Sequence, residues 1–277
     1  MIDRRSKTQR FLSIEVPAAL AVCIAILPVI WMIITSLKPS EEIMRWPVEI
    51  WPSHITLEHY RSLLKETSFS RSILDSAMIA IGAVALGLGV SVPAAYAFSR
   101  FRFRGRGVLL AQFLVINMFP VVLLIIPLFV LMRNFGLIDT PLGIILGHAT
   151  FAIPFSIWMM TGYMKAIPID LDEASAIDGA SRLQTLWLVV LPLTMPGIVT
   201  TGIYIFVTSW NEYLFAMMLS GQNVRPVTVA MQSFIGEFAL DWGLLSAGGT
   251  LVALPVILLF LLVQRRLVSG MTSGAVK

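Results

Sequence analysis

One short polar segment in this sequence has the residue types to make specific contacts, and it lies between two long apolar runs. It covers residues 173 to 180, with the sequence Glu-Ala-Ser-Ala-Ile-Asp-Gly-Ala, and Val189, Leu191 and Pro192 follow in the next apolar run. Its carboxylates can form charged hydrogen bonds, and its small side chains permit close approach by another surface. This combination favours a docking element. The same residues also suit an interfacial helix that only connects two spans.

The residue patterns of catalytic centres are absent from the sequence. It has no Gly-x-x-x-x-Gly-Lys-Ser/Thr stretch to hold phosphates, and no paired catalytic carboxylates or nucleophile motif. Its three His and single Cys show no metal-ligand spacing. We therefore expect no catalytic residue, no metal site and no cofactor bound by this chain. His148, which lies in an apolar run, is typical of a residue that packs or hydrogen-bonds between helices.

The residues around the polar segment predict two short helices with a sharp turn between them. Asp170 can cap the first helix, and Glu173, three residues later, completes a capping-box pattern. Gly179 suits the left-handed turn that ends a helix, and Ser181 can cap the second helix together with Gln184. One face of the first helix carries three apolar side chains at helical spacing, those of Leu171, Ala174 and Ile177.

The composition indicates that the apolar runs on either side of this segment lie in a membrane. The chain has 277 residues, of which 57% are hydrophobic and 13% charged, and its mean hydropathy is +0.84. Soluble domains normally carry about 25% charged residues. The net charge of +4 does not indicate nucleic-acid binding, because the basic residues gather in the connections between apolar runs.

Six apolar runs are long enough to cross a bilayer as helices. A helix needs roughly 20 apolar residues to span the hydrocarbon core, and backbone groups in lipid must be satisfied internally. We therefore predict a single all-α membrane domain over residues 1–277. Asn117 is followed by Pro120, so we expect a bend in the third span. The runs are 16–37, 76–98, 108–132, 140–164, 186–211 and 242–264.

The distribution of Lys and Arg predicts that both termini are cytoplasmic. The N-terminus, the second and fourth connections and the C-terminal tail together hold thirteen basic residues, and the other connections hold seven. Cytoplasmic loops carry the excess of positive charge. A cleaved signal peptide is the alternative for the N-terminus, but the run 16–37 is longer than the usual signal core of about 7–15 residues.

The polar segment resembles the cytoplasmic coupling loop of permease subunits from binding-protein-dependent ABC importers. That pattern is Glu-Ala-Ala, a Gly after three further residues and, after nine more, a branched apolar residue, any residue and Leu-Pro. Ser175 replaces the second Ala, which exchanges one small side chain for another. Across nearly the whole chain, the six spans, the Trp-Asn-Glu segment at 210–212 and the ending at 273–277 resemble maltose-type sugar permeases. The matching loop positions are Glu173, Ala174, Gly179, Val189, Leu191 and Pro192.

The resemblance implies a type I ABC importer permease fold and a set of partners. In that family, a heterodimer of two homologous permeases sits on two copies of an ATPase, which binds ATP and Mg. An extracytoplasmic sugar-binding protein delivers the solute. The resemblance therefore implies a multi-pass protein of the bacterial cytoplasmic (inner) membrane, which forms half of the path for carbohydrate uptake.

The resemblance also implies contact residues. The coupling loop covers about 165–191, the C-terminal cytoplasmic tail covers 265–277, and the loop toward the binding protein follows the fifth span. The expected ATPase contacts in the coupling loop are Asp172, Glu173, Ala174, Ser175, Ile177, Asp178, Gly179 and Ala180. The expected tail contacts with the ATPase are Ser273, Gly274, Ala275, Val276 and Lys277. The expected binding-protein loop is Ser220, Gly221, Gln222 and Asn223.

Polar and aromatic side chains within or beside the spans are candidates for the solute path. Polar groups in hydrocarbon are costly, so they usually face the bundle interior or water. Aromatic faces with nearby amides and carboxylates suit a sugar. They also suit an ordinary aromatic belt, and an amide such as that of Asn117 can instead join two helices. The candidates for path or gate are Asn117, Phe119, Tyr204, Trp210, Asn211, Glu212 and Tyr213.

Three other functions compete with the sugar permease. An ABC permease for a non-sugar solute would share the same loop. An ion-coupled secondary transporter would be expected to show inverted repeats and ionisable residues at the membrane midplane, and neither is evident. An integral-membrane enzyme would need a catalytic set, which is absent.

The charge distribution makes a testable prediction of topology. The arginines around Phe101 and Phe103 should hold the second connection in the cytoplasm. A single cysteine introduced as Gly105→Cys, in a chain with Cys23→Ser, should resist a membrane-impermeant thiol reagent in intact cells and react after lysis. Labelling from outside would overturn the topology.

Overall fold

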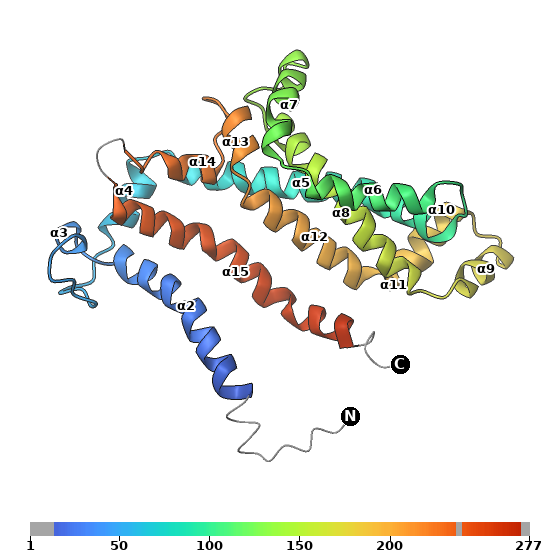
Figure 1. Cartoon of the computed structure of the whole chain (residues 1–277), viewed down its shortest axis with the longest axis horizontal. Coiled ribbons are helices and arrows are strands. Elements are labelled where there is room, and N and C mark those ends of the chain that lie inside the picture. The colour runs from blue at the N-terminus through green and yellow to red at the C-terminus, as the bar shows by residue number, and fades with distance from the viewer. Residues whose placement is uncertain (1–13, 237–239, 273–277) are drawn as a thin grey trace. The chain divides into compact units, whose positions relative to one another are not determined.

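The computed structural model describes residues 14–236 and 240–272, and regular structure in these residues is almost entirely helical (Figure 1). One isolated antiparallel bridge joins Ile235 and Leu240. The chain divides into two compact units, one of residues 1–69 and 231–254 and the other of residues 70–230 and 255–277. The expected tail contacts Ser273 to Lys277 lie outside the described residues.

The first unit contains the first apolar helix and the connection that follows it. Its helices are α2 (Val16–Ser36), α3 (Ser40–Ile43), α4 (Glu58–Lys65) and the first part of α15 (Trp242–Thr272). The end of α2 is tied to α4, because Ser36 Oγ lies 2.7 Å from Tyr60 Oη and His59 Nε2 donates to Lys38 O at 2.9 Å. These bonds satisfy polar groups where an apolar helix leaves the membrane.

The second unit contains the candidate coupling segment. Its helices are α5 (Phe69–Arg100), α6 (Arg106–Met118), α7 (Val122–Asn134), α8 (Pro141–Lys165), α9 (Asp170–Ile177), α10 (Arg182–Thr185), the π-helix Leu186–Val190, α11 (Leu191–Leu193), α12 (Met195–Trp210), α13 (Leu214–Leu219), α14 (Val227–Gln232) and the second part of α15. Residue 69 and the last residues of α14 belong to the first unit.

Two of the six predicted spans are broken rather than continuous. Among the described residues, four helices are long and apolar enough to cross a membrane, and up to six spans result if each bent pair counts as one. The pair α6 and α7 bends by 101°, and the pair formed by 182–193 and α12 bends by 81°. Phe119 is extended because it precedes Pro120, so α6 ends there. The expected bend after Asn117 is thus confirmed, while the uninterrupted runs 108–132 and 186–211 are corrected.

Apolar clusters hold the second unit together at its two ends. At one end, Val92 and Tyr96 of α5 pack with Met164 of α8 and with Leu186 and Val190 of the π-helix. At the other end, α5, α7, α8 and α13 meet in a cluster of Ile79, Met132, Ile144, Leu219 and Val224. The connections α5–α6 and α8–α9 therefore lie at one end of this unit, and α7–α8 lies at the other. Helices that cross a membrane in alternating directions must place successive connections at opposite ends in this way.

Close packing of α8 against α12 depends on Gly197. A Cβ at this position would lie 2.5–2.8 Å from the Cγ, Cβ and Cδ2 atoms of Tyr163, which are too near the backbone to move freely. Gly202, one turn further along α12, would place a Cβ at an ordinary 3.5 Å from Leu88. The two positions differ in available space but not in helix type.

We predict that Gly197→Ala destabilises the protein and that Gly202→Ala does not. Overpacking of a closed contact typically costs about 1–3 kcal/mol. Thermal unfolding of the purified variants in detergent should show a lower midpoint for Gly197→Ala alone. Equal midpoints for the two variants would mean that the helices separate without cost.

Candidate functional site

The first helix of the candidate coupling segment, α9, begins without a side-chain cap. Its N-cap residue is Ile169, and Asp170 is already the first helical residue. The predicted capping box of Asp170 and Glu173 is therefore wrong. Instead, Asp170, Asp172 and Glu173 place three carboxylates in the first turn, where negative charge is favourable to the helix dipole.

The end of α9 follows the sequence prediction. Gly179 has φ of 84°, in the left-handed region. Ala180 N donates to Ser175 O at 2.9 Å and Gly179 N donates to Ala176 O at 3.1 Å, which is the Schellman pattern. Ser181 then starts α10 with the predicted capping box, in which Ser181 N donates to Gln184 Oε1 at 2.8 Å. The sharp turn between the two helices is confirmed.

One face of α9 points away from the rest of the unit. Leu171 and Ala174 are exposed, and Ile177 is 86% exposed at the end of the helix. The side chains of Glu173 and Asp178 are exposed beside them. Ile177 is thus an exposed apolar side chain that lies next to carboxylates and a tight turn. Such a side chain is suited to insertion into a cleft of another protein.

The opposite face of α9 is turned inward. Asp172 is 2% exposed and Ser175 is 8% exposed. Asp172 Oδ2 lies 3.0 Å from Arg100 Nε, and the Tyr96 hydroxyl donates to Asp172 Oδ1 at 3.1 Å. Ser175 Oγ donates to Asp172 O and lies 2.7 Å from Thr185 Oγ1 of α10. We therefore revise the expected role of Asp172 and Ser175 from contact with another protein to internal support.

A second polar group lies where α12 turns into α13. Glu212 accepts hydrogen bonds from Phe215 N at 3.0 Å and Ala216 N at 2.9 Å, so it caps α13. His148 of α8 bridges to this turn, with Nε2 3.0 Å from Glu212 Oε2 and Nδ1 2.7 Å from Ser209 Oγ. The expected interhelical role of His148 is confirmed. Among the described residues, no group of His, Cys, Asp and Glu could hold a metal ion.

The other candidates for the solute path divide into packed and exposed residues. Trp210 is 2% exposed and stacks on Phe206, with ring centroids 5.6 Å apart. Tyr204 packs on Phe155, with ring centroids 4.8 Å apart, and is partly buried against the apolar cluster of Ala83, Ala152 and Ile205. Burial against neighbouring helices corrects the expectation for Trp210, while a path role for Tyr204 stays a prediction.

The exposed candidates are held within their own helices. Asn117 Nδ2 donates to Phe113 O and Asn211 Nδ2 donates to Val207 O, each at 2.9 Å. Phe119 is half-exposed and Tyr213 half-buried. Within the residues that the structure describes, no hydrogen bond or ring contact joins Asn117 or Phe119 to the α12–α13 turn. The candidates therefore do not form one site within this chain.

The expected binding-protein loop is tightly fixed by a residue that sequence analysis missed. The Asp139 carboxylate accepts hydrogen bonds from the backbone N–H groups of Gln222, Asn223 and Val224 at 3.0–3.1 Å, and from Asn223 Nδ2 at 2.9 Å. A Cβ on Gly221 would lie 2.5–2.8 Å from that carboxylate. Desolvation raises the Asp139 pKa, but the donors outweigh it and hold the pKa below its usual value.

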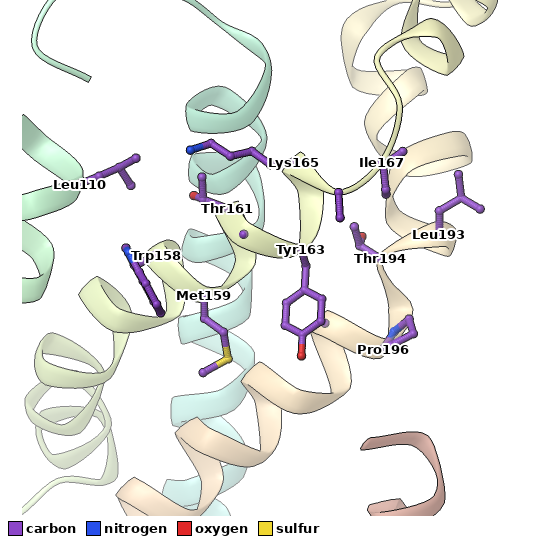
Figure 2. Close-up of a pocket in the computed structure, with 13 residues that line it drawn as sticks. Leu110, Trp158, Met159, Thr161, Tyr163, Lys165, Ile167, Leu193, Thr194 and Pro196 are labelled. Carbon is purple, nitrogen blue, oxygen red and sulfur yellow. The ribbon is translucent and has the colours of Figure 1, made fainter. Parts of the chain in front are cut away.

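A cavity of about 820 Å³ lies at the base of the coupling segment (Figure 2). Its wall includes Tyr163, Lys165 and Ile167, where α8 leads into the segment, and Thr194 and Pro196, where the segment leads into α12. Figure 2 shows Trp158 and Met159 on the preceding turns of α8. The segment is therefore closely packed on its α5 side and open on this side.

Comparison with known proteins identifies relatives over nearly the whole chain. Residues 68–273 match the model of the family described as "Binding-protein-dependent transport system inner membrane component". The chain is 36% identical over 261 residues to the trehalose transport system permease protein SugB of Mycobacterium tuberculosis, covering 93% of this chain and 94% of that one. It is 34% identical over 263 residues to the sulfoquinovosyl glycerol transport system permease protein SmoH of Agrobacterium fabrum, covering 95% and 92%.

A solved structure has the same fold. It is a chain of a bacterial ABC transporter involved in the import of the acidic polysaccharide alginate, with a TM-score of 0.81 and 27% identity. The match covers 94% of this chain and 98% of that chain. The likeness extends from the sequence pattern to the arrangement of the helices.

The Asp139 contacts predict how the loop responds to mutation and to pH. Asp139→Asn should speed amide hydrogen exchange at 222–224 by about tenfold, since bonds to a charged acceptor are each worth about 1.5–3 kcal/mol when buried and less in water. Because the folded-state pKa is lowered, wild-type protection should persist as pH falls below about 3.9 and be lost only at lower pH. Exchange measured by mass spectrometry tests both, with α10 as the internal control. Unchanged exchange at 222–224 in the variant would show that the Asp139 hydrogen bonds do not hold the loop in place.

Proposed function

This chain belongs to the inner membrane components of binding-protein-dependent transport systems, and we propose that it forms half of the translocation path of an ABC importer for a carbohydrate or carbohydrate derivative. Such a component is a non-catalytic subunit. ATP and Mg then belong to a separate ATPase, and this chain converts the movement of that ATPase into movement of its helices.

The observation that carries this proposal is the two-sided helix α9. Its outer face presents Ile177 with Glu173 and Asp178 beside it, and its inner face is bonded to the end of α5. A helix that only connected two spans would have no need of both an exposed apolar knob and a buried polar anchor. We propose that Glu173, Ala174, Ile177, Asp178, Gly179 and Ala180 dock in a cleft of the ATPase.

The partners follow from the same family membership. We propose two ATPase copies, a second homologous permease that completes the path, and an extracytoplasmic binding protein that delivers the solute. We place the chain in the bacterial inner membrane with both termini in the cytoplasm. We propose that the loop of Ser220, Gly221, Gln222 and Asn223 faces the binding protein. The hydrogen bonds from this loop to the Asp139 carboxylate support the proposal, because they hold the loop in one conformation.

A carbohydrate is the favoured solute because the names of the relatives mention several kinds of sugar. These are trehalose, sulfoquinovosyl glycerol and the polysaccharide alginate. Their shared chemistry is a hydroxylated ring, which the exposed amides of Asn117 and Asn211 can bind when a second permease closes the path. A non-sugar solute is the alternative.

Reconstitution tests the function directly. The chain, a second permease, the ATPase and the binding protein from the same source should import a radiolabelled sugar into proteoliposomes only when ATP is supplied to the ATPase. A protonophore should not stop import. Import that follows a proton gradient without ATP would instead indicate an ion-coupled transporter.

We predict that Gly179→Val uncouples the transporter. A β-branched residue at φ of 84° costs about 1–2 kcal/mol and should misplace both α9 and α10. At equal membrane abundance, solute-stimulated ATP hydrolysis and uptake should both fall strongly. Solute binding to the isolated binding protein should not change.

Gly136→Val is the matched control for this variant. Gly136 also has a positive φ, of 68°, with open space around its Cα, but it lies in the α7–α8 connection. It should cost similar strain and preserve coupling. Normal uptake in Gly179→Val would show that the segment does not transmit force.

A further inference from the structure

The last residue of α5, Arg100, holds the coupling segment at two points. Its Nε lies 3.0 Å from Asp172 Oδ2 in α9, and its Nη1 donates to Ile167 O, just before α9, at 3.2 Å. The Arg100 side chain is 5% exposed and that of Asp172 is 2% exposed. Tyr96, one turn earlier on α5, donates to the other carboxylate oxygen of Asp172.

Stability alone does not explain a buried ion pair at this place. Desolvation cancels much of its attraction, and apolar residues of similar volume often stabilise a protein as well or better. The apolar cluster around Val92, Tyr96 and Leu186 already packs α5 against the segment. Apolar contact is non-directional, however, so it permits one surface to slide on another. The ion pair and the Tyr96 hydrogen bond instead fix α9 in one position on α5.

The other end of α5 is bonded to the external loop in a similar way. Asp75 Oδ2 accepts from Arg225 N at 3.0 Å, and Ser76 Oγ accepts from Val227 N at 2.7 Å. Arg71 Nη2 donates to Asn223 O at 3.0 Å. The stretch of α5 between these anchors is a single helix, with Pro93 inside it. At about 1.5 Å per residue, it spans roughly 40 Å.

We propose that α5 is a rigid link between the coupling helix and the external loop, and that Arg100 and Asp172 are the positioning residues at its inner end. Movement imposed on α9 is carried through the buried ion pair into α5. The anchors at Asp75 and Ser76 then carry it to the loop at 223–227. This inference rests on the proposed function and adds the route by which one side of the membrane acts on the other.

The Arg100 geometry distinguishes the link from a simple charge contact. Arginine presents several donors in a planar fork, and here two different nitrogens contact two different acceptors. Lysine keeps the charge but offers one compact ammonium group. Arg100→Lys should therefore insert normally and yet hold only one of the two acceptors.

The first experiment measures coupling in the reconstituted full transporter. Asp172→Asn should lower solute uptake per ATP hydrolysed by at least about fivefold, the lower end of typical coupling between sites. Association with the ATPase should stay unchanged, because the outer face of α9 is intact. Asp170→Asn, the same change at an exposed position of α9, is the control and should behave as wild type.

A purely structural role predicts a different result. Asp172→Asn would then reduce the amount of complex and its thermal stability, while uptake per ATP would remain normal in the complexes that form. That outcome would overturn the proposal. If Asp172→Asn cannot be purified, Arg100→Lys carries the same test, with the exposed Arg102→Lys as its control.

The second experiment tests whether both ends of α5 belong to one link. Ser76→Ala removes the acceptor for Val227 N and should reduce stimulation of hydrolysis by the binding protein. The double variant with Asp172→Asn should lose little more than the stronger single variant, because either change breaks the same link. Additive losses would mean that the two anchors act independently, and the link would be refuted.

Gly179→Val separates failure of this inference from failure of the proposed function. If Gly179→Val uncouples the transporter while Asp172→Asn, Arg100→Lys and Ser76→Ala behave as wild type, α9 couples by another route and the α5 link is wrong. If all four variants transport normally, the coupling function itself is wrong.

Discussion

A charged side chain that leaves water needs a partner, and this requirement determines how the ends of the helices are joined. The chain has few charges in its apolar segments, and several of the buried ones in the described residues lie at or near helix ends. Asp172 meets Arg100, Glu212 meets His148 and the first turn of α13, and Asp75 meets a backbone N–H. In the first unit, Lys38 is buried as well, and its Nζ donates to Glu49 O at 2.6 Å. Each contact fixes a connection to a helix where apolar packing alone would leave the position adjustable.

The two polar anchors of the second unit have different neighbours and therefore different consequences. At one end, the anchor lies beneath the helix whose outer face presents Ile177 and Glu173. At the other end, Asp139, Asp75 and Ser76 hold the segment 222–227 by its backbone. Between them, α5, α8 and α12 pack through small residues such as Ala83 and Ala152. An element that transmits displacement needs this combination of a stiff centre and specifically bonded ends.

The exposure of the path candidates supports our proposal that a second chain completes the solute path. Trp210 is buried and Tyr204 is partly buried within this chain, while Asn117 and Asn211 are exposed and donate hydrogen bonds to the backbone of their own helices. Half of a path that is completed by a partner would have this character, because polar groups that face water in the complex must also face outward from the single chain. The range of sugars among the relatives is consistent with a subunit whose few exposed amides contribute modestly to selectivity.

The sequence alone determined the membrane class, the helical fold, the family and the local geometry of the coupling turn. The left-handed turn at Gly179 and the capping box at Ser181 depend on residues within one helical turn, so local rules predicted both correctly. Asp170 was a reasonable cap by the same rules, but Ile169 is the N-cap residue and Asp170 is already the first residue of the helix. Only the tertiary structure decided which side of α9 faces inward. Asp172 and Ser175 have the same local pattern as their exposed neighbours, and the partner of Asp172 on α5 lies 76 residues away at Tyr96.

The same reason applies to Asp139, which no motif distinguishes and which becomes important because residues 222–224 fold back onto it. Burial and pairing between distant segments depend on how helices pack, and the period of a single helix does not contain that information.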